Sequence, residues 1–168
     1  MLKKLFAASL LFFVLAGCGK ETKCEYDPCA NPAPEAEVQR VQTYLTGAGI
    51  SNAQKHCSGV FYVITEAGTG NNPNSCSNVS VSYVGKLEDG TVFDQTTPQN
   101  PTAVFNLRSL ISAWTNVIPQ LKKGGKVTLF VPPSKGYGSE DVIDRSTGRI
   151  IIPGNSILIF DITLNDLD

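Results

Sequence analysis

Histidine is almost absent from this sequence, and its scarcity excludes several kinds of active site. His56 is the only histidine in 168 residues, so a serine or cysteine nucleophile that needs a histidine elsewhere in the chain has no partner. Zinc sites need four ligands, and the close pair Cys24 and Cys29 has no second close cysteine pair to complete them. The sequence therefore predicts no metal site and no cofactor, and His56 is expected at the surface.

A surplus of charge is also missing. Lys plus Arg number 14 and Asp plus Glu number 15, which gives a formal net charge of −1. Nucleic acid binding depends on a cluster of basic side chains that neutralises phosphates, and no such cluster is present. We expect no nucleic acid partner.

No apolar run in the sequence is long enough to span a bilayer. Lys3 and Lys4 precede an apolar stretch at residues 5–16, which is the pattern of a secretion signal over residues 1–17. The following run Leu-Ala-Gly-Cys resembles the lipobox of bacterial lipoproteins, in which the cysteine is acylated and becomes the mature N-terminus. Cys18 is thus predicted to carry lipid such as palmitate and to anchor the protein to a membrane. The alternative is an ordinary signal peptide followed by a chance cysteine.

The residue after the predicted lipidation site indicates a cellular compartment. Gly19, where an Asp would favour retention, indicates the outer membrane of a bacterial cell envelope. Of five cysteines, four remain after Cys18 is acylated, an even number in an oxidising compartment. Disulfides are therefore expected, with three possible connectivities; the first choice pairs neighbours in sequence, Cys24 with Cys29 and Cys57 with Cys76.

Residues 18–57 are expected to connect this anchor to a domain. Polar residues and three prolines mark residues 18–34 as a flexible tether. Val38, Val41 and Leu45 form one stripe of a short amphipathic helix at residues 35–46, within a helical extension at residues 35–57. The stripe is expected to pack on its own domain, with dimerisation as the alternative.

The rest of the chain, residues 58–168, has the pattern of an α+β domain. β-branched and aromatic residues predict strands at residues 60–65, 79–87, 126–131 and 157–164. One short helix lies among them, with Ser109 as the expected N-cap and Pro119 near its end. The apolar face of this helix is expected to cover one face of a sheet. We therefore predict an antiparallel sheet wrapped around one short helix, preceded by the N-terminal amphipathic helix.

The most specific motif is VSYVGKLEDGTVFD at residues 81–94. On physical grounds it is a strand, a turn at Asp89 and Gly90, and a second strand. It resembles the pattern V-x-Y-x-G-x-L-x-D-G-x-x-F-D of FKBP-type peptidyl-prolyl cis/trans isomerases. The runs LISAW at 110–114, PSKGYG at 133–138 and IIP at 151–153, followed by LIFD at 158–161, extend the resemblance.

The resemblance implies an isomerase that acts on proline-containing, unfolded or exported polypeptides without acid or base. It implies that Trp114 forms the floor of a proline pocket, with Tyr137 and the Ile111 N–H as donors to substrate carbonyls. The residues implied to line the pocket are Tyr83, Phe93, Asp94, Leu110, Ile111, Trp114, Tyr137, Ile152 and Phe160.

Two departures from the family pattern stand out. Ala103 or Val104 occupies a place where the family often has an aromatic residue, which predicts a thinner pocket wall, and the loop at residues 139–149 is longer than in compact members. Two alternatives to catalysis remain, a binding module that holds unfolded chains and a structural lipoprotein, because a fold alone does not establish activity.

Overall fold

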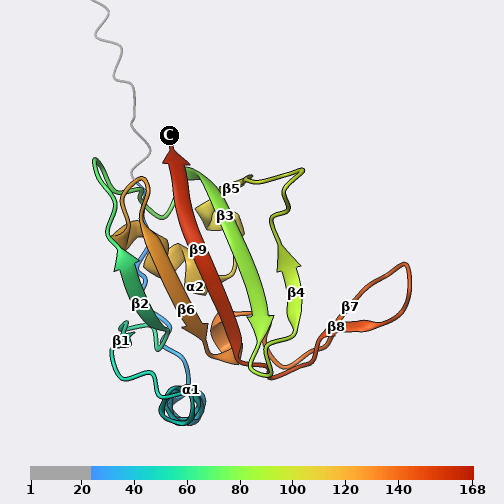
Figure 1. Ribbon diagram of the computed structural model, residues 1–168. Coiled ribbons are helices and arrows are strands. Elements are labelled where there is room, and N and C mark those ends of the chain that lie inside the picture. Colours follow the sequence, from blue (N-terminus) through green and yellow to red (C-terminus); the bar gives the residue numbers. More distant parts are fainter. Residues whose placement is uncertain (1–23) are drawn as a thin grey trace, which may run out of the picture.

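The computed structural model describes residues 24–168, and its main feature is an antiparallel sheet with a short helix against one face (Figure 1). The strand order is β1-β2-β6-β9-β3-β4, and β5 pairs with β3 beside β4. The α+β class with an antiparallel sheet and one short helix is confirmed. The strands of this sheet are β1 (Gln54–Lys55), β2 (Phe61–Glu66), β3 (Asn78–Leu87), β4 (Val92–Gln95), β5 (Ala103–Asn106), β6 (Lys126–Val131) and β9 (Leu158–Leu167).

The remaining elements are short, apart from the first helix. Helix α1 is Glu35–Gly47 and helix α2 is Ser112–Val117; the 3-10 helices are η1 (Leu107–Ser109), η2 (Ile118–Gln120) and η3 (Pro133–Lys135). Strands β7 (Val142–Ile143) and β8 (Ile150–Ile152) form a separate two-stranded hairpin. No helix within residues 24–168 is both long and apolar enough to cross a membrane.

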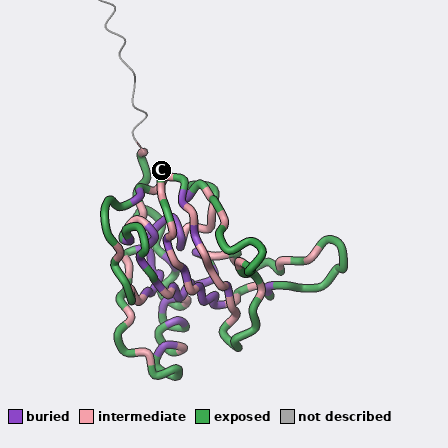
Figure 2. The backbone as a smooth tube through the Cα atoms, turned by 45° about the horizontal axis from the view of Figure 1, so that its top comes forward, coloured by how far each residue is buried: buried purple, intermediate pink, exposed green. Residues whose placement is uncertain are grey.

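The inner face of the sheet holds the main core. Alternation along β9 directs Leu158, Phe160, Ile162 and Leu164 to this face, and all four are buried in one cluster with residues of α2. The purple, buried stretches of Figure 2 accordingly alternate with pink, partly buried ones along the long strands. This face supplies the pocket described below.

The outer face is apolar at one end only, and α1 covers that end. Phe61, Phe130 and Ile159 are paired neighbours on β2, β6 and β9, and they pack with Val38 and Val41 of α1. The predicted helical stripe therefore packs on its own domain. Apolar side chains on both faces of a sheet must be packed against other elements. Helix α2 packs on the inner face, and α1 packs on the apolar end of the outer face.

The α2 region differs from the prediction at its start. Ser109 belongs to η1, where its hydroxyl donates to the Asn106 carbonyl at 2.8 Å, and α2 begins only at Ser112 with Ile111 in the cap position. The reason is that Leu110 is extended, with φ −95° and ψ 174°, so it separates the two helical turns. Pro119 lies in η2 directly after α2, as expected for a residue that cannot continue a helix.

The disulfides connect the chain in a different order from the one predicted. Cys24 bonds Cys76 and Cys29 bonds Cys57, with Cα–Cα distances of 5.9 and 5.4 Å. The predicted pairing of Cys57 with Cys76 is wrong because Cys57 precedes β2 and Cys76 precedes β3. These strands run in opposite directions, since three antiparallel pairings connect them through β6 and β9, so their starts lie at opposite ends of the sheet.

The flexible tether predicted at residues 18–34 is also corrected, because part of it is fastened to the domain. Residues 24–34 are fastened to the domain at Cys24 and Cys29, and the Ala33 N–H donates to the Ser58 carbonyl at 2.8 Å. In Figure 1 this blue segment runs behind the sheet toward α1. The predicted signal at residues 1–17, the lipidation site Cys18 and the first part of the tether lie outside the described residues.

The long loop at residues 139–149 contains part of a projecting hairpin. β7 pairs with β8 through Val142 with Ile152 and Ile143 with Ile150, and the pair extends away from the body of the domain in Figures 1 and 2. Its base is fixed by a hydrogen bond of 2.7 Å from the Gly154 N–H to the Asp141 carboxylate. The sequence predicts the extra length but not the strands.

Candidate active site

An aromatic pocket opens between the inner face of the sheet and the start of α2. Its cavity measures about 140 Å³. β3, β4, β5 and β9 each contribute side chains, and the rest come from the chain just before α2, from α2 itself and from the segment after η3. The lining residues are Tyr83, Asp94, Phe105, Leu110, Ile111, Trp114, Tyr137 and Phe160.

Trp114 forms the floor of this pocket and is fixed by three rings. Its ring meets Tyr83, Phe160 and Phe105 edge to face, with centroid distances of 5.2, 5.4 and 6.1 Å. Such arrangements bring the positive edge of one ring to the negative face of another. Trp114 Nε1 is buried with no hydrogen-bond partner within residues 24–168, so packing alone holds the indole in place.

Gly85 explains one fixed position of the 81–94 motif. A Cβ at Gly85 would lie 2.7 Å from Phe93 Cζ and 2.9 Å from Phe160 Cε1. The missing side chain lets these two rings meet edge to face below β3, with centroids 5.5 Å apart. Phe93 thus supports the wall from behind without lining the cavity.

Two phenols and a carboxylate form the polar part of the pocket. The Tyr83 hydroxyl donates to Asp94 Oδ2 at 2.6 Å. Burial, followed by this hydrogen bond and the charge of Asp94, raises the pKa of Tyr83 far above its ordinary value. Burial and then the Asp94 charge also raise the pKa of Tyr137. Both phenols therefore remain protonated donors at neutral pH.

Two further donors are available to a bound molecule. In the part of the chain that the structure describes, neither the Tyr137 hydroxyl nor the Ile111 N–H donates a hydrogen bond to another residue. Tyr137 is 46% exposed, and Ile111 stands in the cap position of α2, where backbone N–H groups lack helical partners. The pocket therefore combines apolar walls with unpaired donors at its edge.

The structure brings together all of the predicted pocket residues except two. Phe93 lies behind Phe160, and Ile152 is buried in the main core without lining the cavity. Phe105 is the lining residue that the sequence prediction missed. β5 alternates, so Phe105 faces inward while Val104 is 72% exposed. Phe105 thus supplies an aromatic ring next to the position, Ala103 or Val104, where a thinner wall was expected.

Metal binding has no candidate site among residues 24–168. No three His, Cys, Asp or Glu side chains in that range converge to hold an ion. Four of the cysteines are engaged in the two disulfides.

An antiparallel sheet wrapped on a short helix, with an aromatic pocket between them, defines an FKBP-type domain. The family described as "FKBP-type peptidyl-prolyl cis-trans isomerase" matches residues 70–165, more than half of the chain, and the chain belongs to that family. The family prediction is thereby confirmed.

Several relatives share this similarity. The chain is 33% identical to FkpA of Escherichia coli strain K12 over 147 residues, covering 88% of this chain and 50% of that protein. A probable FKBP-type isomerase of Haemophilus influenzae is also 33% identical, with 57% of its length covered. The chain spans about half the length of these curated relatives.

Solved structures agree with the fold. A peptidyl-prolyl cis-trans isomerase from Pseudomonas syringae pv. tomato matches with a TM-score of 0.66 at 31% identity, covering 82% of this chain and 98% of that one. The crystal structure of Escherichia coli FkpA also gives a TM-score of 0.66 at 33% identity, covering 80% of this chain and 59% of that one.

Proposed function

We propose that this protein is a peptidyl-prolyl cis/trans isomerase whose catalytic site is the pocket around Trp114. The observation that carries the proposal is the combination found there: a floor and walls of packed rings, with the Ile111 N–H and the Tyr137 hydroxyl unpaired at the edge. Family membership gives independent support.

The chemistry requires no broken bond. Rotation about an X-Pro bond meets a barrier of about 20 kcal/mol, which comes from amide resonance. The twisted amide has lost that resonance, and its carbonyl is less polar than in either planar isomer. A pocket that excludes water and offers few dipoles disfavours the planar, more dipolar amide relative to the twisted one, and this difference lowers the barrier.

Each polar group then has a separate role. The Ile111 N–H and Tyr137 hydroxyl donate to carbonyls of the chain that flanks the proline, which fixes the substrate while one side of the amide turns. Asp94, restrained by the Tyr83 hydroxyl at 2.6 Å, faces the rotating carbonyl. Trp114 and Phe160 hold the pyrrolidine ring by contact.

The isomerase is proposed to act on exported polypeptides while anchored by lipid on Cys18. The signal-like start of the chain, the LAGC run and the two disulfides support this location. Because Cys24 is fastened to the domain, only the six steps from Cys18 to Cys24 separate the anchor from the fold. Fully extended, they span about 20 Å, so the domain would stay close to the bilayer.

Membrane fractionation tests the anchor. Wild-type protein is expected in the outer membrane fraction, and Cys18→Ser protein is expected in the soluble fraction. Equal distribution of the two proteins would contradict lipidation at Cys18.

A refolding assay tests the activity. The mature chain carrying Cys18→Ser is added to a protein whose refolding is limited by proline isomerisation, and the slow phase should accelerate in proportion to enzyme concentration. Phe105→Ala should weaken this effect, whereas Val104→Ala, which alters the exposed neighbour, should leave it intact. A chain that only suppresses aggregation, with no acceleration of the slow phase, would indicate a binding module instead.

A further inference from the structure

The N-terminal segment that the sequence predicts as a tether lies against the back of the pocket. We define residues 24–37, which are the described part of the predicted tether and the first three residues of α1, as the strap. It reaches three elements that carry or adjoin pocket residues: η1, through the disulfide to Cys76, helix α2, and the turn at η3. Each contact is made by a different residue or pair of residues of the strap.

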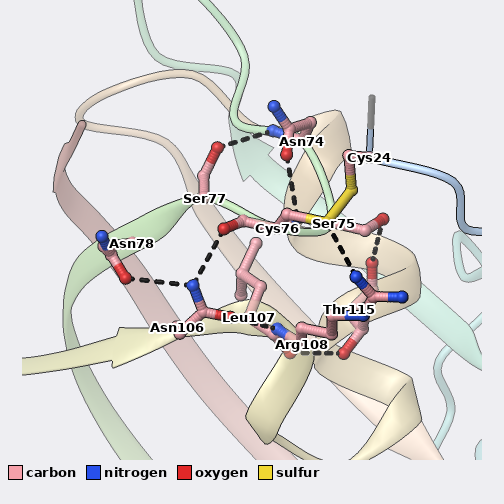
Figure 3. The surroundings of a disulfide bond; sticks show 10 residues. All are labelled: Cys24, Asn74, Ser75, Cys76, Ser77, Asn78, Asn106, Leu107, Arg108 and Thr115. Atoms are coloured by element: carbon pink, nitrogen blue, oxygen red, sulfur yellow. Dashed lines mark hydrogen bonds between the residues drawn. A yellow bond between two sulfur atoms is a disulfide. The ribbon is translucent and has the colours of Figure 1, made fainter. Parts of the chain in front are cut away.

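The first contact is the Cys24–Cys76 disulfide, shown with its surroundings in Figure 3. The Cys76 carbonyl accepts a hydrogen bond from Asn106 Nδ2 at 2.9 Å, and the adjacent Ser75 hydroxyl donates to the Thr115 carbonyl of α2 at 3.3 Å. The Thr115 hydroxyl in turn donates to the Leu107 carbonyl at 2.6 Å. The start of the strap is thus linked to η1 and α2, the elements on either side of Leu110 and Ile111.

The second contact reaches α2 directly. The Tyr26 hydroxyl donates to Asn116 Oδ1 at 2.6 Å, and Asn116 is only 5% exposed. Asn116 lies two residues after Trp114, so this bond fixes the helix that supplies the pocket floor.

The third contact holds the turn that carries Tyr137. The Ser134 N–H donates to the Glu37 carboxylate at 2.8 Å, and the Lys135 ammonium donates to the Asn31 carbonyl. Lys135 is only 8% exposed, an unusual position for a lysine. The Lys135 carbonyl also accepts a hydrogen bond from the Ser112 hydroxyl at the start of α2.

We propose that the strap positions the pocket from behind, and that Glu37 and Lys135 are positioning residues for Tyr137. This inference rests on the proposed isomerase function. Neither side chain lines the cavity, so both act through the turn at residues 133–137. The Tyr137 hydroxyl must lie within hydrogen-bond distance of a substrate carbonyl. Small displacements of the backbone that carries it weaken this hydrogen bond and lower kcat.

Variants of Glu37 give the sharpest test, made on the mature chain with Cys18→Ser and both disulfides formed. Glu37→Ala removes the acceptor of the Ser134 N–H, whereas Glu37→Gln keeps a carbonyl oxygen there. The matched control is Glu35→Ala, an exposed carboxylate in the same first turn of α1. We expect Glu37→Ala to lower kcat about threefold with KM unchanged, which corresponds to one modest hydrogen bond, while Glu37→Gln and Glu35→Ala stay near wild type.

Lys135→Met provides a second route to the same turn. Methionine keeps an apolar chain but removes the ammonium, and Lys122→Met at an exposed lysine is the control. We expect kcat to fall about tenfold while the melting temperature stays equal or rises, because removing a buried charge need not destabilise the fold. A purely structural role would lower the melting temperature and leave kcat of the folded protein unchanged.

Hydrogen exchange gives a readout that does not depend on activity. The Gly136 and Gly138 N–H groups both donate to the Pro133 carbonyl, at 3.0 and 2.9 Å, and neither touches Glu37. Their exchange should accelerate in Glu37→Ala and Lys135→Met and return to the wild-type rate in Glu37→Gln. Unchanged exchange in both variants would overturn the inference, as would faster exchange with unchanged kcat in an active enzyme. If the wild type proves inactive, the proposed function fails, and the exchange rates alone decide whether the strap holds this turn.

Discussion

The two faces of the sheet are covered in different ways. The inner face is covered by α2, and the rings around Trp114 come from β3, β5 and β9. The outer face is covered by α1, which is joined to the domain through the strap and by disulfides that close sequence separations of 52 and 28 residues. The comparison teaches that local patterns build the pocket, while connections distant in sequence hold it in place.

Removing a phenylalanine from either face should separate function from stability. Phe160→Ala and Phe130→Ala each empty a buried site, one at the pocket and one below α1, and each should cost about 3–5 kcal/mol of unfolding free energy. Only Phe160→Ala should also abolish isomerase activity in the protein that remains folded, because Phe130 is remote from the pocket. Urea unfolding and peptide kinetics on the same samples provide the measurement. Equal loss of activity in both variants would contradict the claim that only the inner face of the sheet carries the catalytic site.

Breaking one disulfide should mainly affect stability. Replacing Cys29 and Cys57 together with serine opens a link across 28 residues, and the unfolding free energy should fall by about 3 kcal/mol. The pocket keeps its rings, so kcat/KM should change far less than in Phe160→Ala. Denaturant unfolding monitored by Trp114 fluorescence measures the first quantity. A double variant as stable as wild type would show that this disulfide is dispensable for the fold.

A methyl group added at Gly85 should disturb the pocket wall. The new Cβ would collide with both Phe93 and Phe160, and overpacking of this kind costs about 1–3 kcal/mol. Gly47→Ala is the matched control, since nothing lies within 4 Å of a Cβ at that position. Thermal unfolding compares the two variants. If Gly85→Ala has the same melting temperature as wild type, the two rings can move apart without loss of stability.

The smallest effect concerns alkaline pH. The pKa of Tyr83 is raised in the folded state, so the unfolded chain releases this proton first as the pH rises above about 10. The stabilising contribution is complete below that pH and declines above it, and Tyr137 contributes in the same direction. Tyr83→Phe should therefore show a shallower loss of stability between about pH 9 and 11, measured by urea unfolding at each pH. Parallel curves for the two proteins would contradict the assigned shift.

The sequence predicts much of the inner face because its signals are local. The 81–94 motif places Tyr83 and Asp94 on adjacent strands, and the strand predicted at residues 126–131 has the observed bounds of β6. Phe105 was missed because β5 is only four residues long and its inward face depends on pairing with β3. The helix start was misplaced because a serine at position 109 satisfies a cap pattern that the extended Leu110 interrupts.

The strap could not be predicted in the same way. Residues 24–34 have the composition of a mobile linker, polar and rich in proline, and their order comes from contacts across about a hundred residues, such as that of Asn31 with Lys135. Cysteine spacing alone leaves three connectivities, and the correct one depends on the end of the sheet at which β2 and β3 each begin. Topology decides the pairing, and topology is not a local property.

The most direct test of the central claim is the pH dependence of catalysis. Among residues 24–168, no histidine, lysine or cysteine lines the pocket, and both of its phenols keep their protons well above neutrality. We therefore expect kcat/KM on a proline-containing peptide to be nearly constant between about pH 6 and 8. A bell-shaped or steeply sloping profile in that range, with circular dichroism unchanged, would contradict catalysis by desolvation and hydrogen bonding in this pocket.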